Sequence, residues 1–429
     1  MRYLVFIYMI GLSTLPSFAE SAFTPQQCFE LAKQNHPARL QQEQLKQIYA
    51  LQKQITRTMR LPQFNIEGQA SYQSDVITLD LPSSIPGLSL PSMPKDQFKL
   101  NTNIHQLIYD GGLTKNKHEF QKADLNTKLQ ELEIELYQQQ FQISDIFFQY
   151  FILHENKKAL QSAIDILHKQ EKSIQSSVKN GILLRSDIML IQSEIINTEQ
   201  NFQQVLLSIN ATKEILSIMV DSSMRSAQLL LPKHNHIDTL TNTRPEYILF
   251  DYQKEKLEYA EKLKASEIKP IVNGFGTLGY GKPGLNMLNN KADNYYIVGI
   301  NCKLPLWNWQ KNKREQEVLK LQANIIVHQQ TTFDRSIRIQ KINLQNNFEI
   351  LKHRILADKA LIGKQNNILE LFDVQLKNGT ITANDYLSQL NKVTQATISL
   401  SSHQIQLKKI IVEYNLLIGS YASTSLNKQ

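Results

Sequence analysis

The chain of 429 residues contains one series of landmarks twice, and this duplication limits the folds that it can adopt. A helix-like run opens at Asn35-His36-Pro37, and another opens at Arg244-Pro245-Glu246. Further along, Lys179-Asn180-Gly181 recurs as Lys377-Asn378-Gly379. Landmarks that return in the same order predict two copies of one structural unit.

We assign the first repeat to residues 20–225 and the second to residues 244–419, with a connector at 226–243 and a C-terminal tail at 420–429. Residues 1–19 precede the repeats and have the pattern of a signal peptide. A basic residue, Arg2, is followed by a short apolar stretch and then by small residues at Ser17 and Ala19. Such a stretch is typical of a cleaved export signal, so we expect the mature chain to be exported.

Each repeat is predicted to contain a pair of strands with two different faces. Side chains in 64–73 alternate between apolar and polar, and 98–108, 272–280 and 296–304 follow the same period of two. Strands of about 10 residues suit a tilted crossing of a membrane. The residues that we predict to face lipid are Tyr72, Leu100, Tyr280 and Val298, and those that we predict to face a water-filled lumen are Glu67, Lys99 and Asn101.

Aromatic residues lie at both ends of the predicted strands. The set near the hairpin tips is Tyr72, Phe98, Tyr280 and Tyr296, and the set near the helices is Phe64, Tyr109, Trp307 and Trp309. Amphipathic rings favour the two interfaces of a membrane, so this distribution predicts two aromatic girdles. The tips, 74–96 and 281–294, would then be extracellular loops. The alternative is an ordinary hairpin packed on a soluble core.

Most of the remaining chain is predicted to form long helices. Apolar residues recur at spacings of three and four in 125–178, and every seven residues in 188–216 and 386–414, which is the pattern of a coiled coil. The chain has only 15 Gly and 13 Pro, so few residues interrupt these helices. Asn180-Gly181 and Asn378-Gly379 would form the corners between helices, because glycine readily adopts a left-handed conformation after a helix.

Four strands are too few to close a barrel, and open strand edges are not tolerated in lipid. Closure therefore requires several copies of the chain. Two copies would supply eight strands and three would supply twelve, and the strand pattern alone leaves both open. The polar strand faces would line the lumen, and the long helices would project into the periplasm.

The duplicated strand–strand–helix–helix plan resembles the TolC-type outer-membrane efflux protein family. The stretch Gln106-Leu107-Ile108-Tyr109-Asp110-Gly111-Gly112 carries the resemblance, together with Gly181 and Gly379, each followed six residues later by an aspartate. The resemblance implies a mainly α fold, with a trimeric twelve-stranded outer-membrane β-barrel that continues as a periplasmic α-helical tunnel. It also implies the cell outer membrane as location, and a periplasmic adaptor (membrane fusion) protein and an inner-membrane transporter as partners.

The sequence departs from the family pattern at three places. Leu107-Ile108 stands where the first repeat often has a proline, and Trp307-Asn308-Trp309-Gln310 replaces the double glycine in the second repeat. Some members latch the closed entrance with an arginine and a tyrosine, and the positions that we align with them carry Ile381 and Leu376. Arg185 is a candidate substitute.

The resemblance places the helix corners at the tips of the tunnel. There, Asn180, Gly181, Asn378 and Gly379 would contact the adaptor. Asp187 and Asp385 are candidate gate residues, because a trimer would gather each into a ring of carboxylates, and such rings favour cations. The alternative role is a helix N-terminal acid that interacts with the helix dipole.

No enzyme, cofactor or metal site is predicted. The formal net charge is +8, but Lys and Arg are dispersed, so nucleic-acid binding is not expected. The histidine pair His234 and His236 fits a solvated connector, and a disulfide between Cys28 and Cys302 is not expected. We interpret the chain as an exit channel of a tripartite efflux pump. An exit duct for type I protein secretion and a soluble periplasmic coiled-coil scaffold are the alternatives.

Overall fold

A computed structural model describes residues 22–77, 93–224, 227–232, 243–287 and 289–421. The predicted signal peptide, the middle of the first hairpin tip, the histidine pair and nearly all of the tail lie outside these residues. The chain forms two compact units, one within 1–39, 134–245 and 335–429, and the other within 40–133 and 246–334. Each unit therefore combines segments of both predicted repeats.

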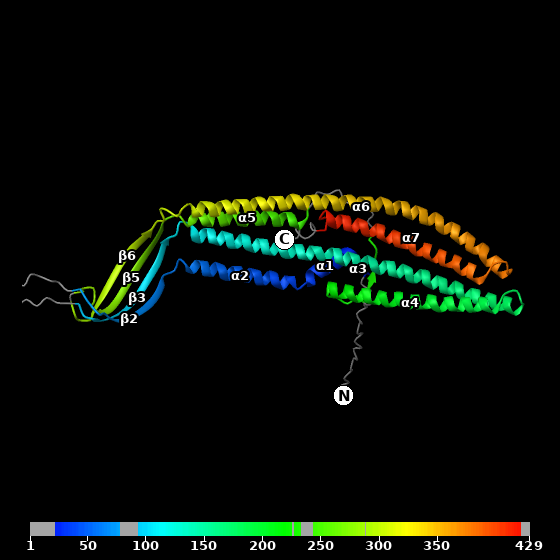
Figure 1. Ribbon diagram of the computed structural model, residues 1–429, viewed down its shortest axis with the longest axis horizontal. Coiled ribbons are helices and arrows are strands. Elements are labelled where there is room, and N and C mark those ends of the chain that lie inside the picture. Colours follow the sequence, from blue (N-terminus) through cyan, green and yellow to red (C-terminus); the bar gives the residue numbers. More distant parts are fainter. Residues whose placement is uncertain (1–21, 78–92, 225–226, 233–242, 288, 422–429) are drawn as a thin grey trace, which may run out of the picture. The chain divides into compact units, whose positions relative to one another are not determined.

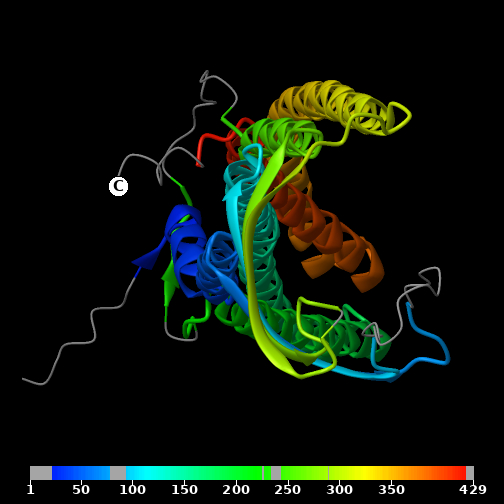
Figure 2. The ribbon, with the colours of Figure 1, turned by 90° about the vertical axis from the view of Figure 1, so that its left-hand side faces the viewer.

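The second unit contains a four-stranded antiparallel sheet (Figure 1). Its strands are β2 (Gln63–Tyr72), β3 (Asp96–Tyr109), β5 (Ile271–Lys282) and β6 (Asp293–Lys303), in the order β2-β3-β5-β6. All four predicted strands are confirmed. Figure 2 shows that the strands bend along their length, as twisted antiparallel strands do.

The register keeps the predicted apolar positions on one face across all four strands. Ile66 pairs with Thr102, Thr102 with Leu278, and Leu278 with Tyr296. A β-bulge between Leu107 and Tyr109 is the one shift in the β3–β5 register. Because side chains alternate with a period of two, this register sorts the residues of every strand between two faces.

Helices of the second unit pack beside one another through polar and aromatic contacts. These helices are most of α2 (Ala38–Thr58), most of α5 (Pro245–Ser266), and the first parts of α3 (Leu113–Lys179) and α6 (Lys311–Lys377). Tyr49 of α2 stacks on His118 of α3 with ring centroids 5.9 Å apart. Lys256 of α5 pairs with Asp124 of α3 at 2.6 Å.

The first unit contains α1 (Pro25–Asn35), α4 (Arg185–Val220), α7 (Ala383–Leu417) and the later parts of α3 and α6. Two short strands, β1 (Ala22–Phe23) and β4 (Gln228–Leu229), pair in parallel. Neither α1 as a separate helix nor these two strands were predicted from the sequence. Thr24 and Gln27 form a capping box that starts α1.

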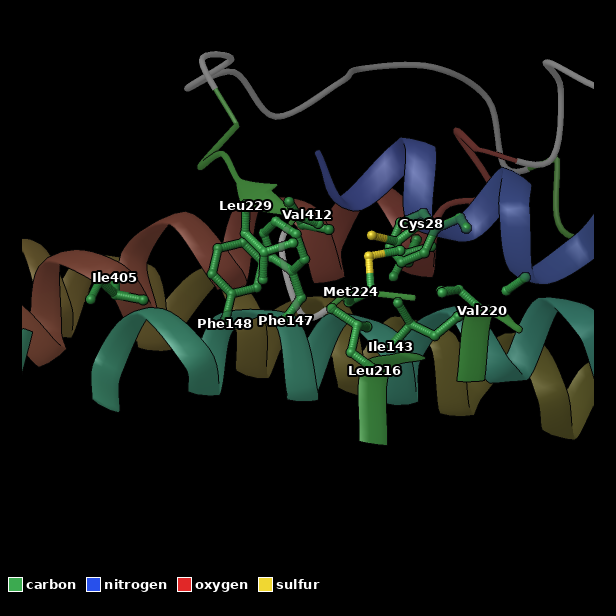
Figure 3. Close-up of a cluster of buried hydrophobic side chains, with 14 residues drawn as sticks. Cys28, Ile143, Phe147, Phe148, Leu216, Val220, Met224, Leu229, Ile405 and Val412 are labelled. Atoms are coloured by element: carbon green, nitrogen blue, oxygen red, sulfur yellow. The ribbon is translucent and has the colours of Figure 1, made fainter. Parts of the chain in front are cut away.

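A hydrophobic cluster holds the first unit together. Phe147 and Phe148 of α3, Leu216 and Val220 of α4 and Cys28 of α1 are all fully buried in it (Figure 3). Burial raises the pKa of the Cys28 thiol to about 12, so this cysteine stays protonated and inert. Cys28 and Cys302 are both free, the first buried and the second exposed.

Candidate functional site

The apolar face of the sheet is open to the outside of the chain. Ile66 is 73% exposed and Val298 is 78% exposed. The four residues predicted to face lipid all belong to this face: Tyr72, Leu100, Tyr280 and Val298. Phe98 and Tyr280 touch across β3 and β5, with ring centroids 6.0 Å apart. An apolar surface that extends over four strands requires a partner other than water.

The opposite face of the sheet is rich in polar side chains. Glu67 pairs in register with Asn101, and the Asn65 amide donates to the Glu67 carboxylate at 2.7 Å. Lys99 belongs to the same face, because it pairs with Gln69. The structure therefore brings the three residues predicted to line a lumen, Glu67, Lys99 and Asn101, to one side of β2 and β3.

Two aromatic rings on this polar face were not predicted. Tyr295 of β6 lies over Gly279 of β5 and donates its hydroxyl hydrogen to Asn101 Oδ1 of β3 at 2.7 Å. A Cβ at Gly279 would lie 2.3 Å from Tyr295 Cζ, so only glycine leaves room for the ring. Phe275 covers Gly299 in the same way. The sequence signal available for these rings was the pair of glycines within the strand pattern, because a glycine inside a strand often marks a place where another group approaches the backbone closely.

The two turns from strand to helix have the same plan but different residues. In the first, Asp110 accepts from the backbone N–H of Gly112 at 3.0 Å and of Thr114 at 2.8 Å. Gly111 and Gly112 have φ angles of 65° and 89°. In the second turn, Asn308 donates to the Asn312 side chain. Trp309 and Gln310 occupy the two left-handed positions, with φ angles of 54° and 58°.

The helix corners have the geometry predicted for them. Gly181 has a φ angle of 74° and Gly379 has one of 70°. After each glycine, a backbone N–H returns to the last turn of the preceding helix, from Ile182 to Ser177 at 2.9 Å and from Thr380 to Gln375 at 3.0 Å. These bonds satisfy helix carbonyls that would otherwise have no partner. Asn180 and Asn378, which precede the two glycines, are exposed.

The two candidate gate carboxylates cap the helices that follow the corners. Asp187 Oδ2 accepts from Leu184 N at 3.0 Å, and its Oδ1 accepts from Ala383 N at 3.4 Å. Its side chain is buried and ties the start of α4 to the start of α7. Asp385 is exposed and accepts from the Thr382 hydroxyl at 2.7 Å and from the Thr382 N–H at 3.1 Å.

The bonds from the Thr382 hydroxyl and backbone lower the pKa of the Asp385 carboxyl below its usual value. Thr382 and Asp385 form a capping box at the start of α7. Arg185 is the first residue of α4, and it is exposed. Each carboxylate therefore caps its own helix, and Asp187 also accepts from the first residue of α7.

The positions that align with the family latch belong to an apolar cluster at the corners. Leu376 is fully buried there with Ile191 of α4 and Leu390 of α7, and Ile381 packs against the cluster. Tyr386 is buried in the same cluster, and burial raises the pKa of its hydroxyl to about 12. Apolar side chains thus surround both positions.

Within the described ranges, no helix is both long and apolar enough to cross a membrane. The same part of the chain contains no cluster of three side chains suited to hold a metal ion.

Comparison with solved structures identifies the fold. The structure of the outer-membrane protein VceC from Vibrio cholerae superposes with a TM-score of 0.66 at 13% identity, covering 92% of this chain and 95% of that chain. The CmeC outer-membrane channel of Campylobacter jejuni gives 0.66 at 14% identity, covering 92% and 85%. The chain has the TolC-type outer-membrane channel fold.

The open-state MtrE outer-membrane channel of Neisseria gonorrhoeae gives a TM-score of 0.64 at 14% identity, covering 92% of this chain and 88% of that chain. No family model matches the chain, and no curated protein matches it in sequence. The TolC-type fold was the one expected from the duplicated plan and the Asp110-Gly111-Gly112 turn. The sequence identity to these structures is low, so the similarity lies in the arrangement of helices and strands.

Proposed function

We propose that this chain is a protomer of an outer-membrane exit channel, which passively conducts substrates delivered by an inner-membrane transporter through a periplasmic adaptor. The observation that carries the proposal is the four-stranded sheet, whose exposed apolar face stays in register from β2 to β6. The TolC-type fold supports the same function, since the solved structures CmeC and MtrE are outer-membrane channels.

The two faces of the sheet would have different roles in such a channel. The face with Leu100 and Val298 would contact lipid, and the face with Glu67, Lys99 and Asn101 would line the water-filled lumen. Among the residues that the structure describes, no strand pairs with the outer edge of β2 or of β6. Because unpaired backbone groups are very costly in hydrocarbon, these edges support closure with further copies, which we propose to be a homotrimer.

The helix corners would form the periplasmic entrance. The exposed turns at Asn180-Gly181 and Asn378-Gly379 are the proposed contacts for the adaptor. Asp385 is the stronger candidate for a carboxylate ring, because its side chain is exposed, whereas Asp187 is buried against Ala383. Arg185, exposed beside Asp187, is the proposed counter-charge at the entrance.

A soluble coiled-coil scaffold is the less favoured function. It accounts for the long helices but leaves the apolar face of the sheet in water, where a surface of that extent favours association. Expression of the full chain, followed by fractionation and planar-bilayer recording, separates the two. An outer-membrane channel should require detergent for extraction and should give discrete conductance steps. Recovery of a folded protein in the soluble periplasmic fraction, without conductance, would overturn the proposal.

A further inference from the structure

The polar face of the sheet is not uniform across its four strands. On β2 and β3, every paired row of this face carries polar side chains. On β5 and β6, three successive rows of the same face instead pair Phe275 with Gly299, Thr277 with Ile297, and Gly279 with Tyr295. Side chains in successive rows are neighbours, so Phe275, Ile297 and Tyr295 form an apolar strip within a polar wall.

The two rings of the apolar strip are held against the sheet. A Cβ at Gly299 would lie 2.7 Å from Phe275 Cζ and 2.9 Å from its Cε1, so this ring lies on the backbone of β6. Tyr295 lies on the backbone of β5 at Gly279 in the same way. Each ring is half-buried, and Ile297 is 42% exposed. Rings that lie on the sheet turn their opposite faces away from it, where a flat solute can stack on them.

Two side-chain amides of β3 flank the apolar strip. Asn103 Oδ1 accepts from the Thr277 hydroxyl at 2.9 Å, and Asn101 Oδ1 accepts from the Tyr295 hydroxyl at 2.7 Å. These bonds fix the orientation of both amides. In the part of the chain that the structure describes, the Nδ2 group of neither asparagine has a hydrogen-bond partner. The wall beside the strip therefore offers oriented N–H donors.

The charges on this face do not favour an ion at the apolar strip. Lys99 and Asp293 carry opposite charges and share one row, because both pair with Gly281. Glu67 belongs to β2, which β3 separates from the strip. The titratable side chains that this face carries in the four strands are Glu67, Lys99, His105, Asp293 and Lys303. Since basic and acidic groups are mixed around it, the strip suits an uncharged solute.

We propose that the apolar strip is a transit site for flat, uncharged aromatic solutes that carry acceptor oxygens on their edge. The solute ring would stack on Phe275 and Tyr295, and its oxygens would accept from the amides of Asn101 and Asn103. A sugar also has flat faces, but its hydroxyl hydrogens need acceptors, and the Oδ1 atoms of both amides are already engaged. The proposal rests on the proposed channel, whose lumen this face would line, and adds a substrate class to it.

Caffeine is a suitable probe, because it is planar and uncharged and has carbonyl acceptors but no N–H or O–H donor. Full-length protein would be recorded in planar bilayers during addition of caffeine, and the concentration that halves the open-channel current would be measured. Maltotriose serves as the sugar probe. We expect caffeine to reduce the current at a lower concentration than maltotriose does.

Three variants test the parts of the site separately. Phe275→Leu and Tyr295→Leu each remove one ring, and each should raise the half-blocking concentration of caffeine roughly fivefold or more, as expected for loss of one stacking contact. Asn103→Asp can keep the bond from Thr277 but replaces the donor by a carboxylate, so it should raise the same concentration. Gln69→Ala is the matched control, because it changes the same face on β2, away from the strip, and should leave the concentration unchanged.

Several results would overturn the transit site. Normal conductance without block by caffeine contradicts the site alone. Equal block of the natural chain, the ring variants and Asn103→Asp would show that the rings only cover their glycines. Stronger block by maltotriose would assign the strip to sugars. If a ring variant gives no channels, Asn103→Asp, which retains both rings, decides the question. Absence of conductance in the natural chain contradicts the channel, and the site with it.

Discussion

The helices α3 and α6 have the same length, 67 residues, but differ in what surrounds them. In α3, Ile143, Phe147 and Phe148 are completely buried. In α6, Ile339 and Ile342 are more than half exposed. The two helices thus share one backbone plan, but their side chains differ in burial. Helix α3 thus buries large apolar side chains within the chain, whereas α6 presents large apolar side chains outward.

The exposed residues of α6 form an ordered stripe. Residues at spacings of three and four lie on one face of a helix, and a second helix can cover that face. The exposed residues with these spacings include Val318, Leu321, Ile325, Ile339 and Ile342. A separate set, Ile326, Ile337 and Leu351, is buried within the chain. The exposed stripe supports a second copy of the chain as its partner, in agreement with the proposed homotrimer.

The largest expected effect comes from truncating the α3 core. Phe147→Ala should destabilise the protein by about 3–5 kcal/mol, because it leaves a cavity among fully buried side chains. Gln345→Ala alters the equivalent place in exposed α6 and should change stability by less than about 0.5 kcal/mol. Thermal unfolding of both variants in detergent measures the difference. Similar midpoints for the two would remove the distinction between the helices.

The sheet is the region where the two halves should behave alike. Leu100→Arg and Val298→Arg place a charge on the same apolar face, each at a cost of about 2–4 kcal/mol at mid-membrane. Both should reduce the heat-modifiable, membrane-inserted fraction to a similar extent. Asn65→Arg is the control, because it lies on the polar face beside Glu67. Equal losses for Asn65→Arg and Leu100→Arg would show that the faces are not distinct.

The strand-to-helix turns should respond in opposite directions. Gly111→Ala meets both a positive φ angle and the Cβ of Lys269, so we expect a loss of about 1–2 kcal/mol. Trp309→Gly should leave stability unchanged or raise it by up to about 1 kcal/mol, since it relieves a left-handed tryptophan. Paired thermal midpoints in detergent test the sign. A marked loss of stability in Trp309→Gly would indicate that the tryptophan supports the fold.

The two tip carboxylates should show the smallest and most specific effects. Asparagine can still accept a backbone bond at a cap, so Asp385→Asn should fold normally. If Asp385 forms the proposed ring, single-channel recording should show reduced cation selectivity in Asp385→Asn and a smaller change in Asp187→Asn, whose carboxylate is buried. Unchanged selectivity in both variants would leave the carboxylates with their capping role alone.

The pH dependence of the Asp385 cap follows from the direction of its shift. The pKa of this carboxyl is lowered in the folded state, so its ionised form stabilises α7 above the unfolded value. That contribution should disappear as the pH falls through the folded value, below 3.8. Thermal unfolding of Asp385→Asn and of the natural chain should therefore converge in acid. A difference that grows in acid would contradict the assignment.

Periodicity predicted the parts of the fold that depend on local pattern. The strands around Ile66 and Val298 were found because one face of each is apolar along its full length. The corners at Gly181 and Gly379 were found because a left-handed residue after a helix favours glycine. These signals are contained in short stretches of sequence, so no knowledge of distant contacts was required.

Contacts between distant segments were beyond that reasoning. The heptad series predicted a single seam along α3, but Phe147 and Phe148 are buried beside it, because the helix meets residues of α1, α4 and α7 around one cluster. The hydrogen bond from Ala383 N to Asp187 joins residues that are far apart in sequence. The role of a helix N-terminal acid therefore predicted the local contact of Asp187 but not this one. The strand pair β1–β4 has two residues in each strand, too few for any period.

The central claim is that one face of the sheet meets lipid and the other meets water. Spin labels placed singly at positions 64–72 of β2 and 296–301 of β6 test it directly, in a Cys302→Ser background that removes the exposed native thiol. In reconstituted vesicles, collision with oxygen reports lipid and collision with a water-soluble nickel chelate reports solvent. The account predicts that the two accessibilities alternate out of phase with a period of two residues on both strands. Accessibilities that vary in phase, or that show no period of two, would contradict it.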